Sequence, residues 1–538
     1  MEQIGFKNFR KFKDFPPLRL SPITIFVGEN NAGKSTVVKG ILALADFLNE
    51  PRNVELDAFD GVADENRKQI VEKAKSVLKN IKFYFNTSYL AHIGTFKRAL
   101  YNKAENPVIS FFVDFGELSI SIDVTGNSKD EESVSGIVST VEMHNSLYKI
   151  DASFDLIHDK ASVTFNPGNE DIDIPANANG RLKGLRNFLL SFNKPVTFCT
   201  DITSNCDFFR RSLLISLVSS LEESLNASIE EQDNVSDQDD HINNHWSRYF
   251  EPIEGLSHDD KKFLIRFRDS VPNVMPSRYE FKRLRLPLLN GATVPSYRLM
   301  NIEYLYAHAV SQTVLYSAKD TNDYLSRTIH EFASEKYSQY KHDFIVDWMK
   351  KFHVGTNYSI KSVGGEAHLV YITNFDGEKV NLADKGMGSI QLMVLLFRLA
   401  INLPSNGRRT PRQFFRSRFN KIIIIEEPEQ NLHPMLQSKL ADLFYQLNKD
   451  FGFRFIIETH SEYLIRRSQV IVGDNNYKDK AEMEKENPFK VYYFPSDGVP
   501  YDMEYTLSGM FERKFGEGFI NEAGRLHMEV LKNAQKRG

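Results

Sequence analysis

The sequence contains little cysteine and no long apolar run. Its 538 residues include only two cysteines, Cys199 and Cys206, and neither has His or Cys neighbours at zinc-ligand spacing. We therefore expect neither a disulfide framework nor a structural zinc site, which fits a reducing compartment. No run approaches the roughly 20 apolar residues that cross a bilayer, and the first residues lack the apolar core of a signal peptide. These absences predict a cytoplasmic protein with no membrane contact.

A surplus of charge of either sign is also missing. The 67 Lys and Arg residues nearly balance the 71 Asp and Glu residues, which gives a formal net charge of −4. This balance excludes a general attraction of the whole surface to nucleic acid or anionic lipid. Hydrophobic residues make up 41% of the chain and charged residues 26%, as in ordinary folded proteins, so neither disorder throughout nor a fibrous repeat is expected. Any nucleic-acid contact must come from local patches.

Two local basic clusters are candidates for nucleic-acid contact, because basic side chains bind phosphates. The first has Phe414 and Phe415 among its arginines, which are Arg408, Arg409, Arg412, Arg416 and Arg418. The second consists of Arg278, Lys282, Arg283, Arg285 and Arg298. The neutral overall charge favours a different interpretation of both, namely a solvated loop or a subunit interface that faces the acidic segment 222–240.

The opening of the chain has the order of a nucleotide-binding α/β unit. Apolar patterns predict a strand over 4–12, a break at Pro16-Pro17 and a short strand over 18–20. A further strand over 23–27 then runs through a glycine-containing loop into a helix over 36–48.

Similar signals return much later in the chain. Segment 108–165 alternates polar and apolar residues, which predicts a small antiparallel layer. Four consecutive isoleucines at 422–425 predict a parallel strand that is covered on both faces, and a second buried strand is expected over 453–457. Helices are expected over 390–403 and 434–448.

These patterns predict an α/β fold in which a mixed or parallel sheet with flanking helices is joined by an antiparallel β layer and a helical insertion lobe. One nucleotide-binding domain would be divided between two distant stretches of the chain. The expected segments are 1–50 as its first half, 51–180 as a helical and antiparallel β subdomain, 181–354 as a mainly helical insertion lobe, 355–470 as its second half and 471–538 as a C-terminal extension.

The first motif that carries chemistry is Gly28-Glu29-Asn30-Asn31-Ala32-Gly33-Lys34-Ser35, which satisfies the P-loop pattern G-x-x-x-x-G-K-[ST]. The two glycines let the backbone wrap closely, so that its N–H groups and the following helix N-terminus face an anion. Lys34 would reach the outer phosphates, and Ser35 would ligate Mg²⁺. The motif follows a predicted strand and precedes a predicted helix, as it must. ATP and Mg²⁺ are the expected cofactors.

A second motif places carboxylates at the end of the isoleucine strand, where Glu426 and Glu427 follow Ile425. Next to a P-loop, one carboxylate can bind the magnesium and the next can polarise an attacking water. We assign Glu426 to the metal and Glu427 to the general base. The alternative is two solvated acids at a strand end.

Two weaker signals accompany these motifs. His460, in Glu458-Thr459-His460-Ser461, follows the strand over 453–457 and could hydrogen-bond a terminal phosphate, although a lone histidine is more often structural. Gly388 and Ser389, in the stretch DKGMGSIQ, precede a long helix whose N-terminus could receive an anion. Taken alone, that stretch is better explained as an ordinary turn.

The order of these four motifs resembles the ABC-type ATPase heads of the SMC, recombination-repair and OLD group. The opening IGFKNFRKF…LRLSPITIFVGENNAGKST resembles the usual start of these heads, and DKGMGSIQ occupies the place of their signature. IIIIEEPEQNLHP resembles their Walker B and D-loop, and FIIETHS resembles their switch histidine. The resemblance covers residues 1–50 and 380–470. Two departures are Glu426 in place of the common Asp and a signature that is not L-S-G-G-Q, and no Q-loop glutamine can be placed.

The resemblance implies a role for each motif. Lys34, Ser35 and Thr36 would bind nucleotide and magnesium, Glu427 would be the catalytic base, and His460 would be the switch. Gly388 and Ser389 would cap the ATP of the opposite subunit, which implies a homodimer or higher oligomer.

The resemblance also suggests what the ATPase drives. The insertion shows no sustained heptads, unlike SMC proteins, and the last residues lack the D-x-D spacing of an OLD-type Toprim nuclease. Stand-alone heads of this kind resemble ATPase subunits of bacterial anti-phage systems of the Septu type, including retron-associated versions, which are paired with a separate HNH nuclease or a Toprim effector. We therefore expect an ATPase that controls a separate nuclease. The rivals are a DNA-repair ATPase that binds DNA ends or gaps, and a scaffold that holds ATP and hydrolyses it slowly.

Overall fold

The computed structural model describes fourteen stretches of the chain, which are residues 1–49, 72, 75–76, 79–86, 92–116, 118–146, 149–167, 193–202, 302–306, 315–317, 324–404, 422–516, 519 and 522–535. The chain forms two compact units, and each is discontinuous in sequence. Unit 1 comprises Met1–Arg19 and Lys39–Met300, and unit 2 comprises Leu20–Val38 and Asn301–Gly538.

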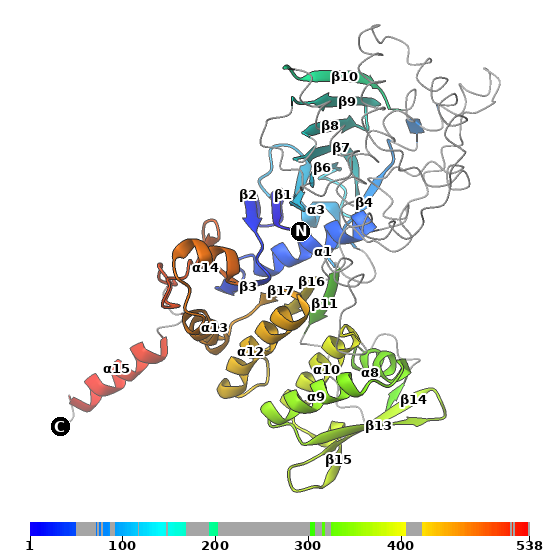
Figure 1. Cartoon of the computed structure of the whole chain (residues 1–538). Coiled ribbons are helices and arrows are strands. Elements are labelled where there is room, and N and C mark those ends of the chain that lie inside the picture. Colours follow the sequence, from blue (N-terminus) through cyan, green and yellow to red (C-terminus); the bar gives the residue numbers. More distant parts are fainter. Residues whose placement is uncertain are drawn as a thin grey trace, which may run out of the picture. The chain divides into compact units, whose positions relative to one another are not determined.

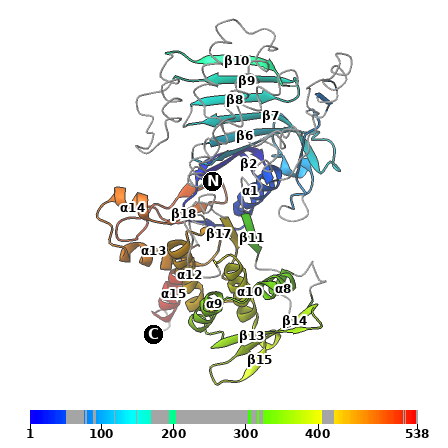
Figure 2. The ribbon, with the colours of Figure 1, turned by 45° about the vertical axis from the view of Figure 1, so that its right-hand side comes forward.

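Unit 1 is built on an antiparallel sheet in the order β10-β9-β8-β7-β6-β5-β1-β2, with β4 also paired to β7 (Figures 1 and 2). Its strands are β1 (Gln3–Phe9), β2 (Phe12–Arg19), β4 (Lys82–Tyr84), β5 (Val108–Asp114), β6 (Leu118–Thr125), β7 (Ser135–Asn145), β8 (Ile150–Asp155), β9 (Lys160–Phe165) and β10 (Val196–Asp201). A short helix, α3 (Phe96–Ala99), precedes β5.

The antiparallel layer follows from the alternation in the sequence. In β5 every second side chain is buried, namely Ile109, Phe111 and Val113, and the residues between them are half-buried. This alternation is expected of a sheet with one covered face. Aromatic rings fill that face: Phe111 stacks on Phe83 at 4.7 Å between ring centroids and lies 5.4 Å from Phe9. Such pairs add to the stability gained by burying the rings.

The break predicted at Pro16-Pro17 is wrong, because β2 runs through both prolines from Phe12 to Arg19. The reason is position: β2 pairs only with β1 and ends the described path of the sheet, so its outer side needs no backbone donors. The strand predicted over 4–12 also divides into two, since β1 ends at Phe9 and β2 begins at Phe12.

Unit 2 contains the sheet that carries the P-loop. Its order is β11-β16-β17-β3-β18-β19, and every neighbouring pair is parallel except β18 with β19. The strands are β11 (Ile302–Tyr306), β16 (Ile422–Glu426), β17 (Arg454–Glu458), β3 (Ile23–Gly28), β18 (Phe489–Phe494) and β19 (Tyr501–Asp502). The isoleucine strand β16 is buried at Ile422–Ile425, as the apolar run predicted.

The other elements of unit 2 are helices and a small antiparallel sheet. The helices are α1 (Lys34–Asn49), which continues into unit 1, α8 (Tyr324–Ser334), α9 (Gln339–Lys351), α10 (Met387–Ile401), α12 (Pro434–Phe451), α13 (Glu462–Asp474), α14 (Lys480–Glu486) and α15 (Glu522–Gln535), with a 3-10 turn, η2 (Leu382–Asp384). The small sheet has the order β12-β14-β13, with β15 paired to β14. Its strands are β12 (Tyr316–Ser317), β13 (Asn357–Val363), β14 (Ala367–Thr373) and β15 (Lys379–Asn381).

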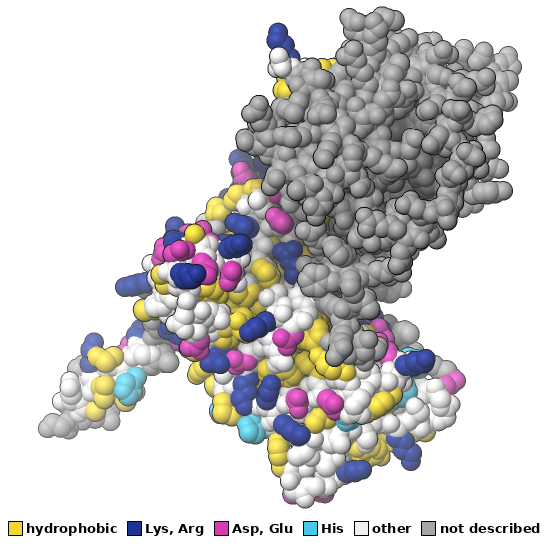
Figure 3. All heavy atoms as spheres, viewed as in Figure 1, with side chains coloured by type: hydrophobic (Ala, Val, Ile, Leu, Met, Phe, Trp, Pro, Cys, Tyr) yellow, Lys and Arg dark blue, Asp and Glu magenta, His cyan; other side chains and the backbone are white. Residues whose placement is uncertain are grey.

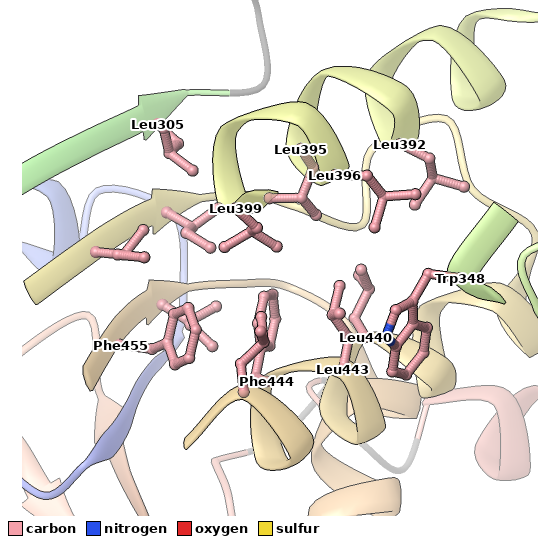
Figure 4. Packing of buried hydrophobic residues seen from close by; sticks show 14 of the residues in the cluster. Leu305, Trp348, Leu392, Leu395, Leu396, Leu399, Leu440, Leu443, Phe444 and Phe455 are labelled. Atoms are coloured by element: carbon pink, nitrogen blue, oxygen red, sulfur yellow. The ribbon is translucent and has the colours of Figure 1, made fainter. Parts of the chain in front are cut away.

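The core of unit 2 joins helices to strands. Figure 4 shows Leu396 and Leu399 of α10 facing Leu443 and Phe444 of α12, with Phe455 of β17 beside them. Each of these side chains is almost fully buried, and burial stabilises such a side chain by about 1.5–3 kcal/mol. This packing joins α10, α12 and β17 in one core.

The α/β class is confirmed, with a mostly parallel sheet, flanking helices and a separate antiparallel layer. The five segment boundaries stay a prediction, and most of the predicted insertion lobe 181–354 lies outside the described residues. Both basic clusters, including Arg408–Arg418, and the acidic segment 222–240 lie outside them too. Cys199 of β10 is exposed with a free thiol, and within the described ranges no helix combines the length and apolarity that a bilayer crossing requires.

Candidate functional site

The P-loop lies between β3 and α1, and its backbone needs glycine at both motif positions. Gly28 has φ +139°, and a Cβ atom there would lie 2.1 Å from the carbonyl oxygen of Phe494. Gly33 has φ +105°, a value that other residues rarely adopt. Between them, Asn30 and Asn31 are exposed and Ala32 is buried, while the backbone N–H of Thr36 donates to the carbonyl of Gly33 at 3.0 Å.

Lys34 lies inside the loop, with only 3% of its surface exposed. Its Nζ donates to the carbonyl oxygens of Glu29 at 2.9 Å and Gly28 at 3.2 Å. Burial lowers the pKa of this ammonium, while the nearby carboxylates of Glu458, Glu427 and Glu429 act in the opposite direction. The ammonium is therefore held where a terminal phosphate would be bound in a P-loop.

The carboxyl ends of β16 and β17 bring two glutamates side by side. These strands are parallel neighbours, and Glu426 pairs with Glu458 in their register. Ser35 donates a hydrogen bond of 2.7 Å from its Oγ to Oε1 of Glu458. Sequence reasoning placed only Glu426 near Ser35. The structure gives that contact to Glu458, since β17 lies between β16 and β3.

Glu458 is 5% exposed, and burial raises its pKa to about 7. The neighbouring carboxylates of Glu426 and Glu427 also raise it, whereas the Ser35 hydroxyl and the Lys34 ammonium lower it. Its second oxygen, Oε2, is buried and accepts no hydrogen bond from any described residue. A carboxylate in this state favours a cation or an ordered water beside it.

Glu427 is held in a turn directly after β16. Its φ of 45° is uncommon for a residue other than glycine and asparagine, and its backbone N–H donates to the carbonyl of Glu458 at 2.7 Å. The side-chain amide of Gln430 donates to Oε2 of Glu427. These bonds fix the carboxylate that was predicted to act as general base.

His460 lies beside Glu427, with 3.8 Å between its Nε2 and the Oε1 of Glu427. Its backbone N–H donates to Oε1 of Glu429 at 2.6 Å, and Glu429 is buried. Burial and the charge of Lys34 lower the pKa of His460, although Glu427 opposes them. A neutral ring can both donate and accept a hydrogen bond. Glu429 was not singled out from the sequence, because nothing in the stretch EEPEQ distinguishes an inward-facing acid from a solvated one.

The predicted signature lies within α10 rather than before it. The helix begins at Met387, with Gly386 as its N-cap, so Gly388 and Ser389 belong to its first turn. A Cβ atom on Gly388 would lie 2.4 Å from the carbonyl oxygen of Asn431, and Nδ2 of Asn431 donates to Gln391 of the same helix at 3.3 Å. The start of α10 is thus packed against the segment that follows Glu427.

The donor set at the sheet edge fits Mg²⁺. The cation commonly takes one or two carboxylates and completes its shell with water and substrate phosphates. Ser35, Glu426 and Glu458 offer a hydroxyl and two carboxylates at adjoining positions. In the part of the chain that the structure describes, no group of three or more His, Cys, Asp or Glu side chains could hold a metal ion. A Mg²⁺ ion at this edge would therefore also need the serine hydroxyl, water and the phosphates of a bound nucleotide.

Comparison with known proteins identifies the family. The profile of the AAA ATPase domain matches residues 1–182 and 282–465, which is more than half of the chain. The chain therefore belongs to the AAA ATPase domain family, and this family implies ATP binding. No curated protein matches the chain.

Solved structures that resemble the chain include three SMC heads. The Smc head domain with an extended coiled coil from Pyrococcus furiosus, bound to the C-terminal domain of ScpA, is 12% identical, with a TM-score of 0.30 and 98% of both chains covered. The SmcHead bound to the C-winged helix domain of ScpA is 9% identical, with a TM-score of 0.33 and coverage of 93% of this chain and 96% of that chain. The SMC head domain from Thermotoga maritima is 8% identical, with a TM-score of 0.29 and coverage of 94% and 98%. Such low scores support no transfer of activity or partners.

Proposed function

We propose that this chain binds Mg²⁺ and ATP at the carboxyl edge of the unit 2 sheet and hydrolyses the ATP. One observation carries the proposal: residues from three distant parts of the sequence meet at this edge. Lys34 and Ser35 come from the P-loop, Glu426 and Glu427 from the end of β16, and the stretch with His460 from the end of β17.

Each side chain then has a task. The backbone N–H groups of the P-loop and Lys34 bind the phosphates, and Lys34 exchanges its two carbonyl partners for phosphate oxygens. Ser35 and Glu426 would hold Mg²⁺, and the bound cation would supply the charge neutralisation that the outer phosphates need. Glu427 orients a water and accepts its proton, and His460 hydrogen-bonds the terminal phosphate.

The proposal includes assembly on ATP. In the ABC-type heads that the motifs resemble, the signature of one subunit completes the site of the next. Gly388 and Ser389 at the start of α10 are the residues we assign to that contact, in a homodimer or higher oligomer. The γ-phosphate would then favour the closed assembly, because only the closed state contacts it from both sides.

The effector is proposed to be a separate nuclease of HNH or Toprim type, controlled in defence against phage. The support is the resemblance of the EEPE and ETHS motifs to the ATPase subunits of such systems. The surface around α14 gives no support for or against such a partner, because its Lys and Arg side chains are interspersed with Asp and Glu (Figure 3).

Two variants test the ATPase. Lys34→Ala should weaken ATP binding about 10–100-fold, because a charged hydrogen-bond donor to phosphate is lost. Glu427→Gln should still bind ATP but release phosphate at least about 100-fold more slowly, because the general base is lost. Calorimetry and a phosphate-release assay measure the two effects. Lys485→Ala and Glu484→Gln on α14 are exposed control substitutions of the same kinds.

If both site variants bind and hydrolyse ATP like the wild type, the site is wrongly placed. In cells, both should also lose protection against phage, and full protection by either would separate the defence role from ATP turnover. Salt-sensitive DNA binding that raises ATP turnover would instead favour the repair ATPase. ATP that remains intact after long incubation with the wild-type protein would favour the slowly hydrolysing scaffold.

A further inference from the structure

The feature that the proposed mechanism leaves unused is the carboxylate of Glu458. It is buried at the end of the strand next to the P-loop strand, and its two oxygens have different surroundings. Oε1 accepts the hydroxyl hydrogen bond of Ser35 at 2.7 Å. Oε2 is buried and has no hydrogen-bond partner among the described residues.

The hydrogen bond from Ser35 to Glu458 fixes the direction of the serine hydroxyl proton. When the hydroxyl proton points at Glu458, the lone pairs of the serine oxygen point elsewhere. A hydroxyl ligates a metal through these lone pairs, so the hydrogen bond to Glu458 leaves the lone pairs of Ser35 available for a metal. Outer carboxylates of this kind commonly orient the groups that touch a metal.

The second carboxylate oxygen, Oε2 of Glu458, needs a hydrogen-bond donor. An unsatisfied oxygen of a buried carboxylate is costly, and the ammonium of Lys34, whose charge acts on Glu458, already donates to the carbonyls of Gly28 and Glu29. Magnesium gives up its waters reluctantly and usually keeps several of them. A metal-bound water is a hydrogen-bond donor of the type that Oε2 lacks.

We propose that Glu458 is a positioning residue of the metal site, which orients Ser35 through Oε1 and accepts a hydrogen bond from a metal-bound water through Oε2. The inference rests on the proposed function, because it requires Mg²⁺ and nucleotide at this edge. With Glu426 in register beside it, Glu458 makes the metal site a pair of carboxylates on neighbouring strands.

A purely structural role for Glu458 makes a different prediction. If the carboxylate only ties the P-loop to β17, its charge is dispensable. Glu458→Gln keeps an oxygen that can accept from Ser35 but removes the negative charge. A structural role therefore predicts normal metal affinity in this variant, whereas a role at the metal predicts a loss.

The experiment uses the full chain, a non-hydrolysable ATP analogue and Mn²⁺ as a spectroscopic probe. Electron paramagnetic resonance measures the affinity for Mn²⁺ in the presence of the analogue, and calorimetry measures the affinity for the analogue in EDTA. We expect Glu458→Gln to weaken Mn²⁺ binding 10–100-fold, as is typical for loss of an outer-sphere partner. Its affinity for the analogue in EDTA should stay within about twofold of the wild type, because the P-loop N–H groups and Lys34 are unchanged.

The matched control is Asp502→Asn on β19, a half-buried carboxylate in the same sheet, which is paired with Lys490. It should leave the affinity for Mn²⁺ unchanged. Wild-type Mn²⁺ affinity in Glu458→Gln overturns the inference. An equal loss of analogue binding in EDTA overturns it too, because it would show that the substitution distorts the P-loop and does not act through the metal. If the wild type itself binds no nucleotide, the proposed function fails together with the inference. Normal nucleotide binding with unchanged metal affinity removes the inference alone.

Discussion

At position 28 the backbone conformation and the surrounding space both require glycine. The φ of +139° is unfavourable for any residue with a side chain, and the carbonyl of Phe494 occupies the space of a Cβ atom. The close approach arises because β3 and β18 are parallel neighbours, with Gly28 paired to Phe494 at their ends. Glycine at position 28 is thus needed both for the close approach of β18 and for the P-loop conformation.

Gly28→Ala is expected to destabilise the protein through both effects. The matched control is Gly377→Ala, because Gly377 also has a positive φ, of +90°, but no atom lies within 4 Å of its Cβ position. The control should cost about 1 kcal/mol in the free energy of unfolding, and Gly28→Ala roughly 1–3 kcal/mol more. Urea denaturation measures both. Equal destabilisation would mean that Phe494 moves away at no cost.

At the scale of single elements, the strands and helices near the site follow their sequence patterns within a few residues. The four isoleucines formed a buried strand, and the acids that follow them lie at its carboxyl end. The order of strands in the sheet was not accessible, because a parallel strand can be added on either side of its predecessor. The neighbours of β3 therefore had to be seen in the structure, and with them the contact between Ser35 and Glu458. Pro16 and Pro17 were misinterpreted for the same reason: the sequence does not tell that β2 has only one partner.

The start of α10 offers a second test at this scale. Gly388 touches the carbonyl of Asn431, whereas Gly386, two residues earlier, has free space around its Cβ position. Gly388→Ala should lower the unfolding midpoint clearly, because the helix must move away from Asn431. Gly386→Ala should lower the free energy of unfolding by only about 0.5–1 kcal/mol, because Ala is a poorer helix N-cap than Gly. Similar midpoints for both variants would refute this close packing of α10.

A histidine pair, with His368 buried and His330 half-buried, couples α8 to the small sheet. Nε2 of His368, on β14, lies 3.1 Å from Nδ1 of His330, on α8, and its Nδ1 lies 3.3 Å from Oγ of Ser362, on β13. Burial first, and His330 second, lower the pKa of His368 from 6.5. The folded state thus binds a proton at this ring less readily than the unfolded state does.

The contribution of His368 to the free energy of unfolding is fully present above the pKa that this ring has in the unfolded state. It is lost as the pH falls through the lower pKa of the folded state. The thermal midpoint of the wild type should therefore fall as the pH is lowered from about 8 to about 5, and His368→Gln should show a shallower fall. Differential scanning calorimetry across this range compares the two. Parallel curves would exclude His368 as a source of the dependence.

At the scale of the whole molecule, the site is proposed to be complete only when a second copy supplies its signature. Glu427→Gln binds ATP without consuming it in the proposed mechanism, so it should accumulate in the assembled state. With ATP and Mg²⁺, analytical ultracentrifugation should show at least a doubling of its mass relative to the nucleotide-free protein. Lys34→Ala under the same conditions should show no change. If nucleotide changes the mass of neither variant, ATP binding does not drive assembly.

The strand that carries the P-loop belongs to unit 2 through a stretch of only Leu20–Val38, while its partners β17 and β18 begin at Arg454 and Phe489. A ribosome that has not yet reached Arg454 has therefore made β3 with neither of its neighbours. Closing this sheet brings together strands that lie near opposite ends of the sequence, and we expect it to be a late, slow event in folding. Competence to receive a nucleotide then comes only after synthesis of the core is essentially complete, so prematurely terminated chains would be unable to respond to ATP at all.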